Sequence, residues 1–480
     1  MVNVYKLTNR LEMDNSNSSR RKFLRQLGSA SLLVPLGSLN SLAAQEAHEK
    51  RILTESKRFS ANDKIRLAVI GAGIMGYQDV YHALSNPGVE LVAACDLYTG
   101  RLEHMKELHG KDLMVTRDYR EILEKNDIDA VIVATSDHWH ARIATDAMEK
   151  GKNVYCEKPM VHQLKEGLPL IKTWQQTKKI MQVGSQNISS LHTQKAQELY
   201  KSGVIGKLNC IEATYDRQSA LGAWEYTMPT DASPQTVDWD RYIAGMPKQP
   251  YDAKKFFWWR NYKEFGTGVA GDLFVHLLTS IHSIIGSTGP NKIYASGEIS
   301  RWKDGRNVPD MMVAILSYPE TPNHPEFQMT LRVNFASGAG EGSLIRFFGD
   351  EGVLDYGWSS VKVQNSIMPK APGIGGWDAL DTYPEDMQKE LLAKYDATYS
   401  AADKQGPKKA PVEYANPANF SPNKEHWANF FDGVRTNKQV IEDPIVAFRA
   451  CAPTLACNDS YFKKEIIHWD PNAMKVMKKA

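Results

Sequence analysis

Short, almost wholly apolar runs alternate with amphipathic stretches between residues 64 and 187. The apolar runs cover residues 65–70, 89–95, 113–116, 130–136, 153–156 and 181–186. Helical patterns fall between several of them, up to residue 84 and at 119–125, 141–150 and 163–178. Nearly continuous apolar strands separated by helices predict a parallel sheet buried on both faces. We therefore expect an α/β domain at 64–187 with a Rossmann, doubly wound parallel sheet.

The pattern of apolar and polar residues changes from Leu208 onward. Further strands are expected at 208–215, 292–298, 311–317, 328–334, 344–348 and 352–355, without regular helices between them. Such a pattern predicts an α+β domain at 188–480 with a mainly antiparallel, open sheet. Its long connections, at 218–262 and 365–420, are of the kind that often carries function. Helices near 425–434 and 444–462 are expected to pack back on the first domain.

A glycine-rich segment follows the first apolar run. Gly71, Gly73 and Gly76 form a G-x-G-x-x-G pattern at a strand-to-helix junction, and Asp96 ends the next strand twenty residues after Gly76. This spacing is typical of dinucleotide binding, in which glycines admit the pyrophosphate and the carboxylate accepts hydrogen bonds from ribose hydroxyls. Ile74 and Met75, within the pattern, are expected at the same cofactor site. Asp96 favours NAD, although nearby Arg101 leaves NADP open.

Two other strands also end in polar residues. Ligands of open α/β sheets bind at the carboxyl ends of the strands. Ser136 and His140 follow the fourth strand and are expected to line the cofactor pocket. Glu157 and Lys158 follow the fifth, in the run Cys156-Glu157-Lys158-Pro159-Met160. Lys158 could hold a substrate hydroxyl beside the cofactor or be an ordinary strand-end lysine paired with a carboxylate. No spacing of ligand residues predicts a metal site.

The glycine motif, the strand-end Asp96 and the Glu157-Lys158-Pro159 run together resemble the glucose–fructose oxidoreductase/inositol dehydrogenase/MocA family. The resemblance implies that Lys158 is catalytic. It also implies a substrate-side helix motif, read here from Gly266 to His276, in which Asp272 and His276 join Lys158. A histidine near neutral pKa with a carboxylate one helical turn away suits alcohol oxidation. The family often has an aspartate three residues after this histidine, where this chain has Thr279.

Aromatic residues precede this motif. Trp259-Arg260 matches a pair that family members commonly carry, and we expect both residues to contact substrate. Aromatic faces stack on sugar rings, and arginine binds hydroxyls. Other aromatic residues of the cluster are expected to form core.

The N-terminal sequence has the pattern of an export signal peptide. Arg20 and Arg21 precede a mildly apolar stretch that ends in Ala43-Ala44. The segment resembles a twin-arginine signal, which implies export of the folded protein to the periplasm; the alternative is a basic amphipathic helix. We expect a signal peptide at 1–44 and a linker at 45–63.

Composition narrows the class of protein. The formal charge is +2, and removal of the six basic and two acidic residues at 1–44 leaves −2, which argues against a nucleic-acid partner. Five cysteines cannot form a disulfide scaffold. No apolar run after the N-terminus is long enough to span a membrane.

These features predict an NAD(P)-dependent enzyme that oxidises or reduces a hydroxyl or keto group of a sugar or glycoside. Because free NAD is scarce outside the cytoplasm, the cofactor should be tightly bound and recycled. The alternatives are an NAD-dependent glycosidase that acts by transient oxidation and elimination, and a non-catalytic sugar- or NAD-binding protein. A homodimer or homotetramer is the family-level expectation.

Overall fold

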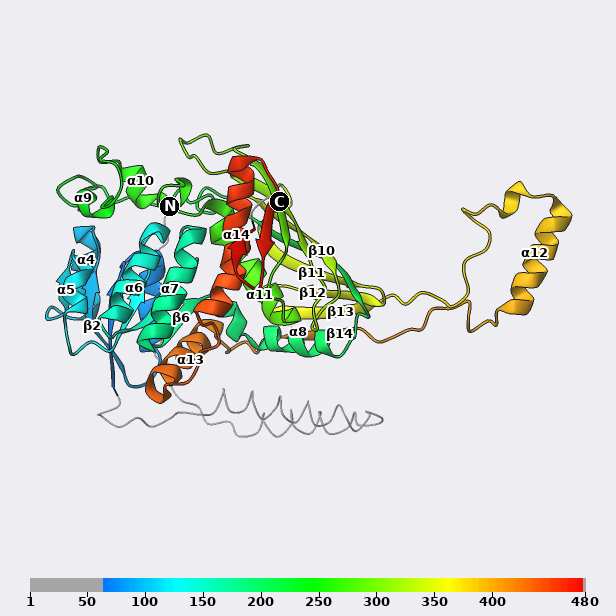
Figure 1. The fold of residues 1–480 in the computed structure, drawn as a ribbon, viewed down its shortest axis with the longest axis horizontal. Helices are drawn as coiled ribbons and strands as arrows, with labels where there is room; N and C mark the ends of the chain where they lie inside the picture. The colour runs from blue at the N-terminus through cyan, green and yellow to red at the C-terminus, as the bar shows by residue number, and fades with distance from the viewer. Residues whose placement is uncertain (1–63, 478–480) are drawn as a thin grey trace, which may run out of the picture. The chain divides into compact units, whose positions relative to one another are not determined.

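The computed structural model describes residues 64–477. Its first sheet has six parallel strands in the order β3-β2-β1-β4-β5-β6 (Figure 1). The strands are β1 (Ile65–Ile70), β2 (Val89–Cys95), β3 (Met114–Thr116), β4 (Ala130–Val133), β5 (Asn153–Glu157) and β6 (Met181–Gly184). The signal peptide and linker predicted at 1–63 lie outside the described residues.

Helices connect these strands and cover the sheet. They are α3 (Ile74–Leu84), α4 (Thr99–His109), α5 (Tyr119–Leu123), α6 (His140–Glu149) and α7 (Leu164–Thr177). The predicted Rossmann, doubly wound arrangement is confirmed. Two predicted strands are too long, because β4 ends at Val133 and β6 at Gly184, where the chain turns into short 3-10 helices.

The second sheet has ten strands in the order β14-β13-β12-β11-β7-β10-β9-β8-β15-β16. They are β7 (Leu208–Asp216), β8 (Lys292–Glu298), β9 (Met311–Tyr318), β10 (Phe327–Asn334), β11 (Gly342–Gly349), β12 (Gly352–Tyr356), β13 (Ser360–Asn365), β14 (Val412–Ala415), β15 (Ile467–Asp470) and β16 (Lys475–Val476). Only β7 and β10 pair in parallel, so the mainly antiparallel prediction is confirmed.

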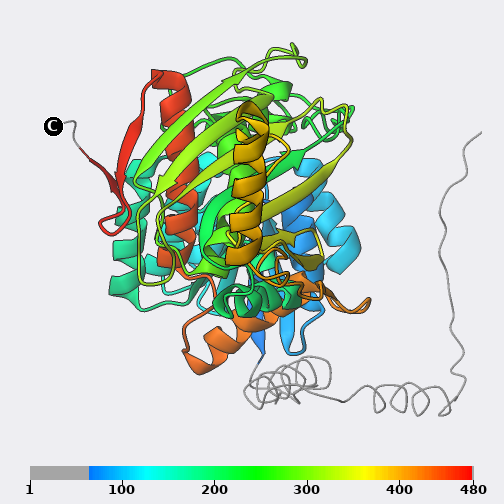
Figure 2. The same ribbon diagram turned by 90° about the vertical axis from the view of Figure 1, so that its right-hand side faces the viewer.

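One face of this sheet carries helices. They are α8 (Leu191–Lys201), α11 (Val275–Ile285) and α14 (Pro444–Lys463), and all three contribute to one core with strands of both sheets. Figure 2 shows the strands of the sheet crossing in front of α14. Alternate residues of β9 are buried on this face, as Ala314 and Leu316 are, while Val313 and Ile315 are exposed on the other.

The C-terminal helices return to the first sheet, as predicted. Trp427, Phe430 and Phe431 of α13 (Pro422–Thr436) are fully buried against β1 residues such as Leu67. Burial of three large aromatic side chains contributes several kcal/mol, on the order of 2–3 each. This packing fixes the first sheet against α13.

The long connections contain structure that the sequence did not predict. Segment 218–262 holds the short helices α9 (Trp239–Tyr242) and α10 (Ala253–Phe257) and the 3-10 turn η4 (Trp259–Asn261). Segment 365–420 holds α12 (Glu385–Thr398), which buries none of its side chains (Figure 1). No helix in residues 64–477 has both the length and the apolar character of a membrane span. All five cysteines are free thiols.

Candidate active site

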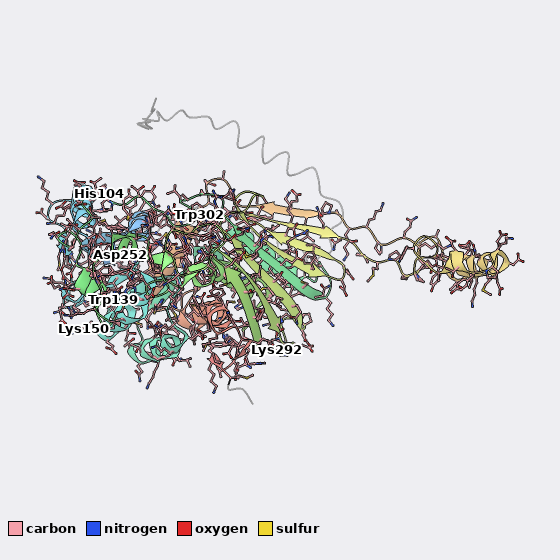
Figure 3. The ribbon with its side chains drawn as sticks, turned by 90° about the horizontal axis from the view of Figure 1, so that it is seen from above. His104, Trp139, Lys150, Asp252, Lys292 and Trp302 are labelled. Carbon is pink, nitrogen blue, oxygen red and sulfur yellow. The ribbon has the colours of Figure 1, made fainter. Side chains whose placement is uncertain are left out.

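A crevice at the carboxyl ends of β1, β2, β4 and β5 collects most of the residues that the sequence singled out. Those that line it are Gly71, Gly73, Ile74, Met75, Asp96, Arg101, Ser136, His140, Glu157, Lys158, Trp259 and Arg260. The opposite wall comes from segment 218–262, and in Figure 3 Trp139 and Asp252 lie in this part of the molecule, whereas Lys292 lies on the ten-stranded sheet.

The glycines of the β1–α3 turn have three different reasons to be glycine. Gly71 has φ +94°, and a Cβ there would lie 2.5 Å from the carbonyl oxygen of Ala134. A Cβ on Gly76 would lie 1.8 Å from the Gly71 oxygen, so this glycine lets α3 pack against the turn. A Cβ on Gly73 would meet only the guanidinium of Arg101, at 3.5 Å. Gly73 therefore leaves space in the crevice itself rather than within the protein core.

The start of α3 is a suitable anion site. No side chain caps its N-terminus, and its first turn contains no acidic residue. Free backbone N–H groups and the helix dipole attract phosphate at such a position. Together with the space at Gly73, this fits the pyrophosphate of a dinucleotide.

Asp96 is fixed at the end of β2. Its carboxylate accepts hydrogen bonds from the backbone N–H of Ala72 at 2.8 Å and of Tyr98 at 2.9 Å. Arg101 Nη1 lies 3.5 Å from the same carboxylate, and its guanidinium lies over the ring of Phe257. The predicted ribose-binding carboxylate thus lies beside the glycine turn.

Segment 218–262 is tied to the Rossmann part by backbone bonds. The N–H of Asp238 donates to the Leu97 oxygen at 2.8 Å, and the N–H of Thr99 donates to the Thr236 oxygen at 3.0 Å. The Tyr98 hydroxyl donates to Asp231 at 2.6 Å. We call residues 226–262 the crevice wall, because these contacts hold them beside the loop that follows β2.

His140 has a positioning role in the structure. It is buried, with Nδ1 at 2.8 Å from the Pro159 oxygen and Nε2 at 3.1 Å from the Thr135 oxygen. The imidazole thereby joins the loop after β4 to the turn after Lys158. Both ring nitrogens contact backbone carbonyls, and no cluster of three potential metal-binding side chains occurs within residues 64–477.

Lys158 and Asp272 form the central ion pair. Lys158 Nζ donates to Asp272 Oδ1 at 2.8 Å and to the Asp272 backbone oxygen at 3.1 Å. Arg260 Nε donates to the same Oδ1 at 3.2 Å. Burial alone would raise the pKa of Asp272, but Lys158 and Arg260 hold it well below its usual value. Asp272 is therefore a permanent anion that fixes two cations.

Asp272 lies in a π-helical turn, η5 (Ala270–Phe274), that leads into α11. The sequence predicted one regular helix carrying Asp272 and His276 on a shared face. Wide turns of this kind are frequent at functional sites. Here the Asp272 carboxylate contacts Lys158, while the His276 ring lies 6.3 Å from the ring of Tyr215.

Two more groups in the site have shifted pKa values. Burial and the charge of Lys158 lower the pKa of His276 to about 3, so this imidazole is neutral at pH 7. Burial raises the pKa of Glu157 to about 7 despite the neighbouring Lys158. Glu157 accepts hydrogen bonds from Gln186 Nε2 at 2.9 Å and from the Lys158 backbone at 3.2 Å.

Trp259 supports Arg260. The guanidinium carbon of Arg260 lies 4.2 Å from the centre of the Trp259 ring, a cation–π contact. The edge of the same ring approaches Gly266, where a Cβ would lie within 3.0 Å. Sugar stacking on Trp259 remains a prediction, and the structure shows that the indole holds Arg260.

Sequence reasoning missed several lining residues. Tyr226, Arg241 and Tyr242 come from the crevice wall, Arg117 from the loop after β3, and Tyr119 from the start of α5. The Asp137 carboxylate accepts hydrogen bonds from the backbone N–H of Thr267 at 2.9 Å and from the Thr267 hydroxyl at 2.7 Å. These bonds join the end of β4 to the substrate-side motif that begins at Gly266. The signals for the wall in the sequence are the unusual length of segment 218–262 and its cluster of aromatic residues.

A nucleotide crevice at the strand ends, beside a buried lysine–aspartate pair, is the arrangement of a nicotinamide-dependent oxidoreductase. The model of the "Oxidoreductase family, NAD-binding Rossmann fold" matches residues 65–185, and that of the "GFO/IDH/MocA C-terminal domain" matches residues 241–355. The chain belongs to the GFO/IDH/MocA family, and its first sheet forms an NAD-binding Rossmann domain.

Curated relatives match less than half of the chain's length. A glycosyl hydrolase family 109 protein of Shewanella sp. (strain ANA-3) is 31% identical over 211 residues, which are 42% of this chain and 46% of that protein. An alpha-N-acetylgalactosaminidase of Shewanella oneidensis is 30% identical over 213 residues, with the same coverage. The chain thus spans about half the length of the curated relatives it matches.

Solved structures share the fold over nearly their whole length. A levoglucosan dehydrogenase in complex with NADH and levoglucosan has a TM-score of 0.59 at 16% identity, covering 84% of this chain and 99% of that chain. The WlbA dehydrogenase of Bordetella pertussis, in complex with NADH and UDP-GlcNAcA, has a TM-score of 0.59 at 15% identity, with 85% and 99% covered. At these identities the likeness shows the fold.

Proposed function

We propose that this protein is an NAD-dependent oxidoreductase that acts on a hydroxyl or keto group of a sugar or glycoside. The observation that carries the proposal is the 2.8 Å contact of Asp272 with Lys158, which lines the crevice that begins at the dinucleotide-binding glycines. Relatives of the same fold that are named as sugar-acting dehydrogenases support the substrate class.

The residues divide the work between cofactor and substrate. Gly73 and the start of α3 hold the pyrophosphate, and Asp96 holds the adenosine ribose. The bound nicotinamide supplies a hydride acceptor or donor. Lys158 holds the reacting oxygen by a hydrogen bond, with Asp272 fixing its ammonium group. His276 is neutral at pH 7, the form that accepts a proton, but its pKa of about 3 makes it a weaker base than the histidine of near-neutral pKa that the sequence predicts.

We further propose that the cofactor is retained through repeated turnovers. The crevice wall supports this proposal, because backbone bonds hold it beside the Asp96 end of the crevice. Retention would suit a protein that is exported to the periplasm in folded form, which is our proposal for the twin-arginine-like N-terminus.

A second candidate is an NAD-dependent glycosidase that oxidises the sugar, cleaves the glycosidic bond by elimination, and then reduces the product. The glycosyl hydrolase names of the curated relatives favour it. The Glu157-Lys158-Pro159 run favours the dehydrogenase, because the family resemblance implies that the glycosidase branch often lacks it. Cleavage of an aryl glycoside without an added electron acceptor would identify the glycosidase, and formation of a keto-sugar alone would identify the dehydrogenase.

The third candidate is a binding protein without catalysis. Mass spectrometry of the released cofactor, combined with product analysis on a panel of sugars and glycosides, tests all three. Unchanged turnover in a Lys158→Ala/His276→Ala double variant would contradict both enzyme proposals.

We propose that the protein is a homo-oligomer, a dimer or a tetramer. The open face of the ten-stranded sheet supports this, since it exposes Tyr294, Val313, Ile315 and Leu344. Analytical ultracentrifugation of the wild-type protein and of an Ile315→Glu variant would test it. A monomer in both cases would contradict the proposal.

A further inference from the structure

The substrate side of the crevice holds more positive than negative charge. The carboxylate of Asp272 is bonded to both Lys158 and Arg260, and the side chains of Lys158 and Asp272 are only 9% and 6% exposed. One carboxylate therefore faces two cations in a site largely removed from water. A buried charge excess of this kind is costly unless a ligand of opposite charge completes it.

The two terminal nitrogens of Arg260 are available as hydrogen-bond donors to a ligand. Its Nε bonds to Asp272 and its guanidinium face packs on Trp259, so the side chain is fixed at two points. Within residues 64–477, its two terminal nitrogens have no hydrogen-bonded protein acceptor, and Arg260 lines the crevice. A planar guanidinium with two terminal N–H groups free matches a carboxylate or a phosphate in a bidentate pair.

Arg217 brings a third cation to this end of the site. Its guanidinium lies 5.5 Å from the centre of the Tyr215 ring, and that ring lies 6.3 Å from His276. Its Nη1 is bonded to the backbone oxygen of Gly222 at 2.7 Å, which leaves its charge without a carboxylate partner among the described ion pairs. The positive charge of Arg217 also helps to lower the pKa values of Asp272 and His276.

Other carboxylates nearby balance these cations only in part, and exposed Glu341 is the one that acts on Arg217. Asp137 accepts two hydrogen bonds from neutral groups of Thr267, which do not offset a carboxylate, and it helps to raise the pKa of Arg260. Asp216 is paired with Arg332. Burial raises the pKa of Glu157 to about 7, so it is only partly ionised at neutral pH. Lys158, Arg260 and Arg217 thus outnumber the two aspartates that act on them, Asp272 and Asp137.

We propose that the substrate is an anionic sugar, a uronic acid or glycuronide, whose carboxylate is held by Arg260 and Arg217 while a ring hydroxyl lies at Lys158. The proposal rests on the proposed function, because it names the substrate class of the same site. A uronate supplies the missing negative charge and carries its hydroxyls within one sugar ring of it.

Calorimetric binding to the purified full-length protein with its bound cofactor tests the substrate class without requiring turnover. The probes are matched pairs, methyl glucuronide against methyl glucoside and methyl galacturonide against methyl galactoside, with phosphate and sulfate monoesters of the same sugars. We expect at least one uronide to bind about 10- to 100-fold more tightly than its neutral partner, the range of one or two charge-assisted hydrogen bonds. The preference should weaken at high ionic strength.

Variants locate the contact. Arg217→Gln and Arg260→Gln should each lower the uronide-to-neutral affinity ratio by about tenfold, whereas Arg217→Lys should keep most of it. Arg301→Gln removes the same charge from an exposed position and should leave the ratio unchanged. Neutral sugars bound as tightly as uronides, or esters bound tightly when uronides are not, would overturn the proposal.

The experiments distinguish a failure of the proposed oxidoreductase function from a failure of the proposed substrate class. Tight, arginine-dependent uronide binding without any reduction of the bound nicotinamide would support this substrate class and contradict the oxidoreductase. Efficient oxidation of neutral sugars with no preference for uronides would do the reverse.

Discussion

Lys158 Nζ lies 2.8 Å from Asp272 Oδ1, although 114 residues separate the two. The pair joins the end of β5 in the nucleotide-binding sheet to the π-helical turn before α11. Through this contact, the carboxylate of Asp272, from the second part of the chain, reaches Lys158 at the end of a strand of the first sheet. The proposed chemistry depends on this contact.

Removal of the lysine should abolish most turnover without loss of the cofactor. Lys158→Met keeps the length of the side chain but cannot donate to a hydroxyl, and we expect sugar-dependent nicotinamide reduction to fall by about 10²- to 10⁴-fold. The control is the amount of bound nicotinamide per chain, measured by mass spectrometry, which should not change. Activity equal to that of the wild type would remove Lys158 from the mechanism.

Gly73 and Gly76 provide a matched pair for the cofactor site. Gly73→Ala adds a methyl group that meets only Arg101, at 3.5 Å, so we expect a loss of about 1 kcal/mol or less in stability but at least tenfold weaker NAD binding. Gly76→Ala places its methyl group 1.8 Å from a backbone oxygen and should destabilise the fold itself. Thermal unfolding and NAD titration together separate the two effects. Equal NAD binding in Gly73→Ala and wild type would contradict the assignment.

The pKa of Glu157 predicts how stability depends on pH. Because burial raises this pKa to about 7, the folded protein binds a proton more tightly than the unfolded chain, whose glutamate titrates near 4.3. The stability associated with the protonated carboxyl is fully present below about pH 4.3 and is lost as pH rises through 7. Glu157→Gln should therefore gain stability relative to wild type between pH 5 and pH 8, by about 1–3 kcal/mol. Denaturant unfolding at both pH values measures the difference, and a constant difference would contradict the raised pKa.

Asp272 predicts the opposite slope. Its pKa is held below the usual value, so the folded protein binds this proton less tightly than the unfolded chain does. Its stabilising contribution is present above the unfolded pKa of about 3.9 and is lost as pH falls below it. Asp272→Asn should be less stable than wild type at pH 7, and the gap should narrow toward pH 3. A gap that widens on acidification would contradict the assignment.

The crevice wall should control how long the cofactor stays bound. Tyr98→Phe removes the 2.6 Å hydrogen bond to Asp231 and leaves the ring packed near Phe257. We expect nicotinamide to dissociate about 3- to 10-fold faster, as suits the loss of one hydrogen bond to a charged group. Retention of cofactor during extended dialysis measures this. No change in the dissociation rate would mean that the wall does not retain the cofactor.

The fold could be predicted well where the pattern is local. The Gly71 turn, the β2 strand ending at Asp96, and the alternation of short apolar strands with helices each follow from neighbouring residues. The polar helices α4 and α8 were missed, because sequences such as that of Thr99–His109 bury only Leu102 and Met105 and show little periodicity.

The sequence predicted most residues of the site, but it predicted fewer of the contacts between them. Lys158 and Asp272 were both named, but a regular helix would have directed Asp272 toward His276, and the π-helical turn could not be read from spacing. Arg217, Tyr226 and the crevice wall depend on contacts such as that of Tyr98 with Asp231, 133 residues apart. Sequence patterns carry no signal for contacts of that range.

The central claim is that a sugar hydroxyl held at Lys158 exchanges hydride with a nicotinamide bound in the same crevice. Its most direct test is rapid mixing of the purified, NAD-loaded protein with single sugars and glycosides, followed by the absorbance of reduced nicotinamide. We predict a single-turnover rise with at least one sugar in the wild type and none in Lys158→Met. Stoichiometric bound NAD that is reduced by no sugar or glycoside would contradict the claim.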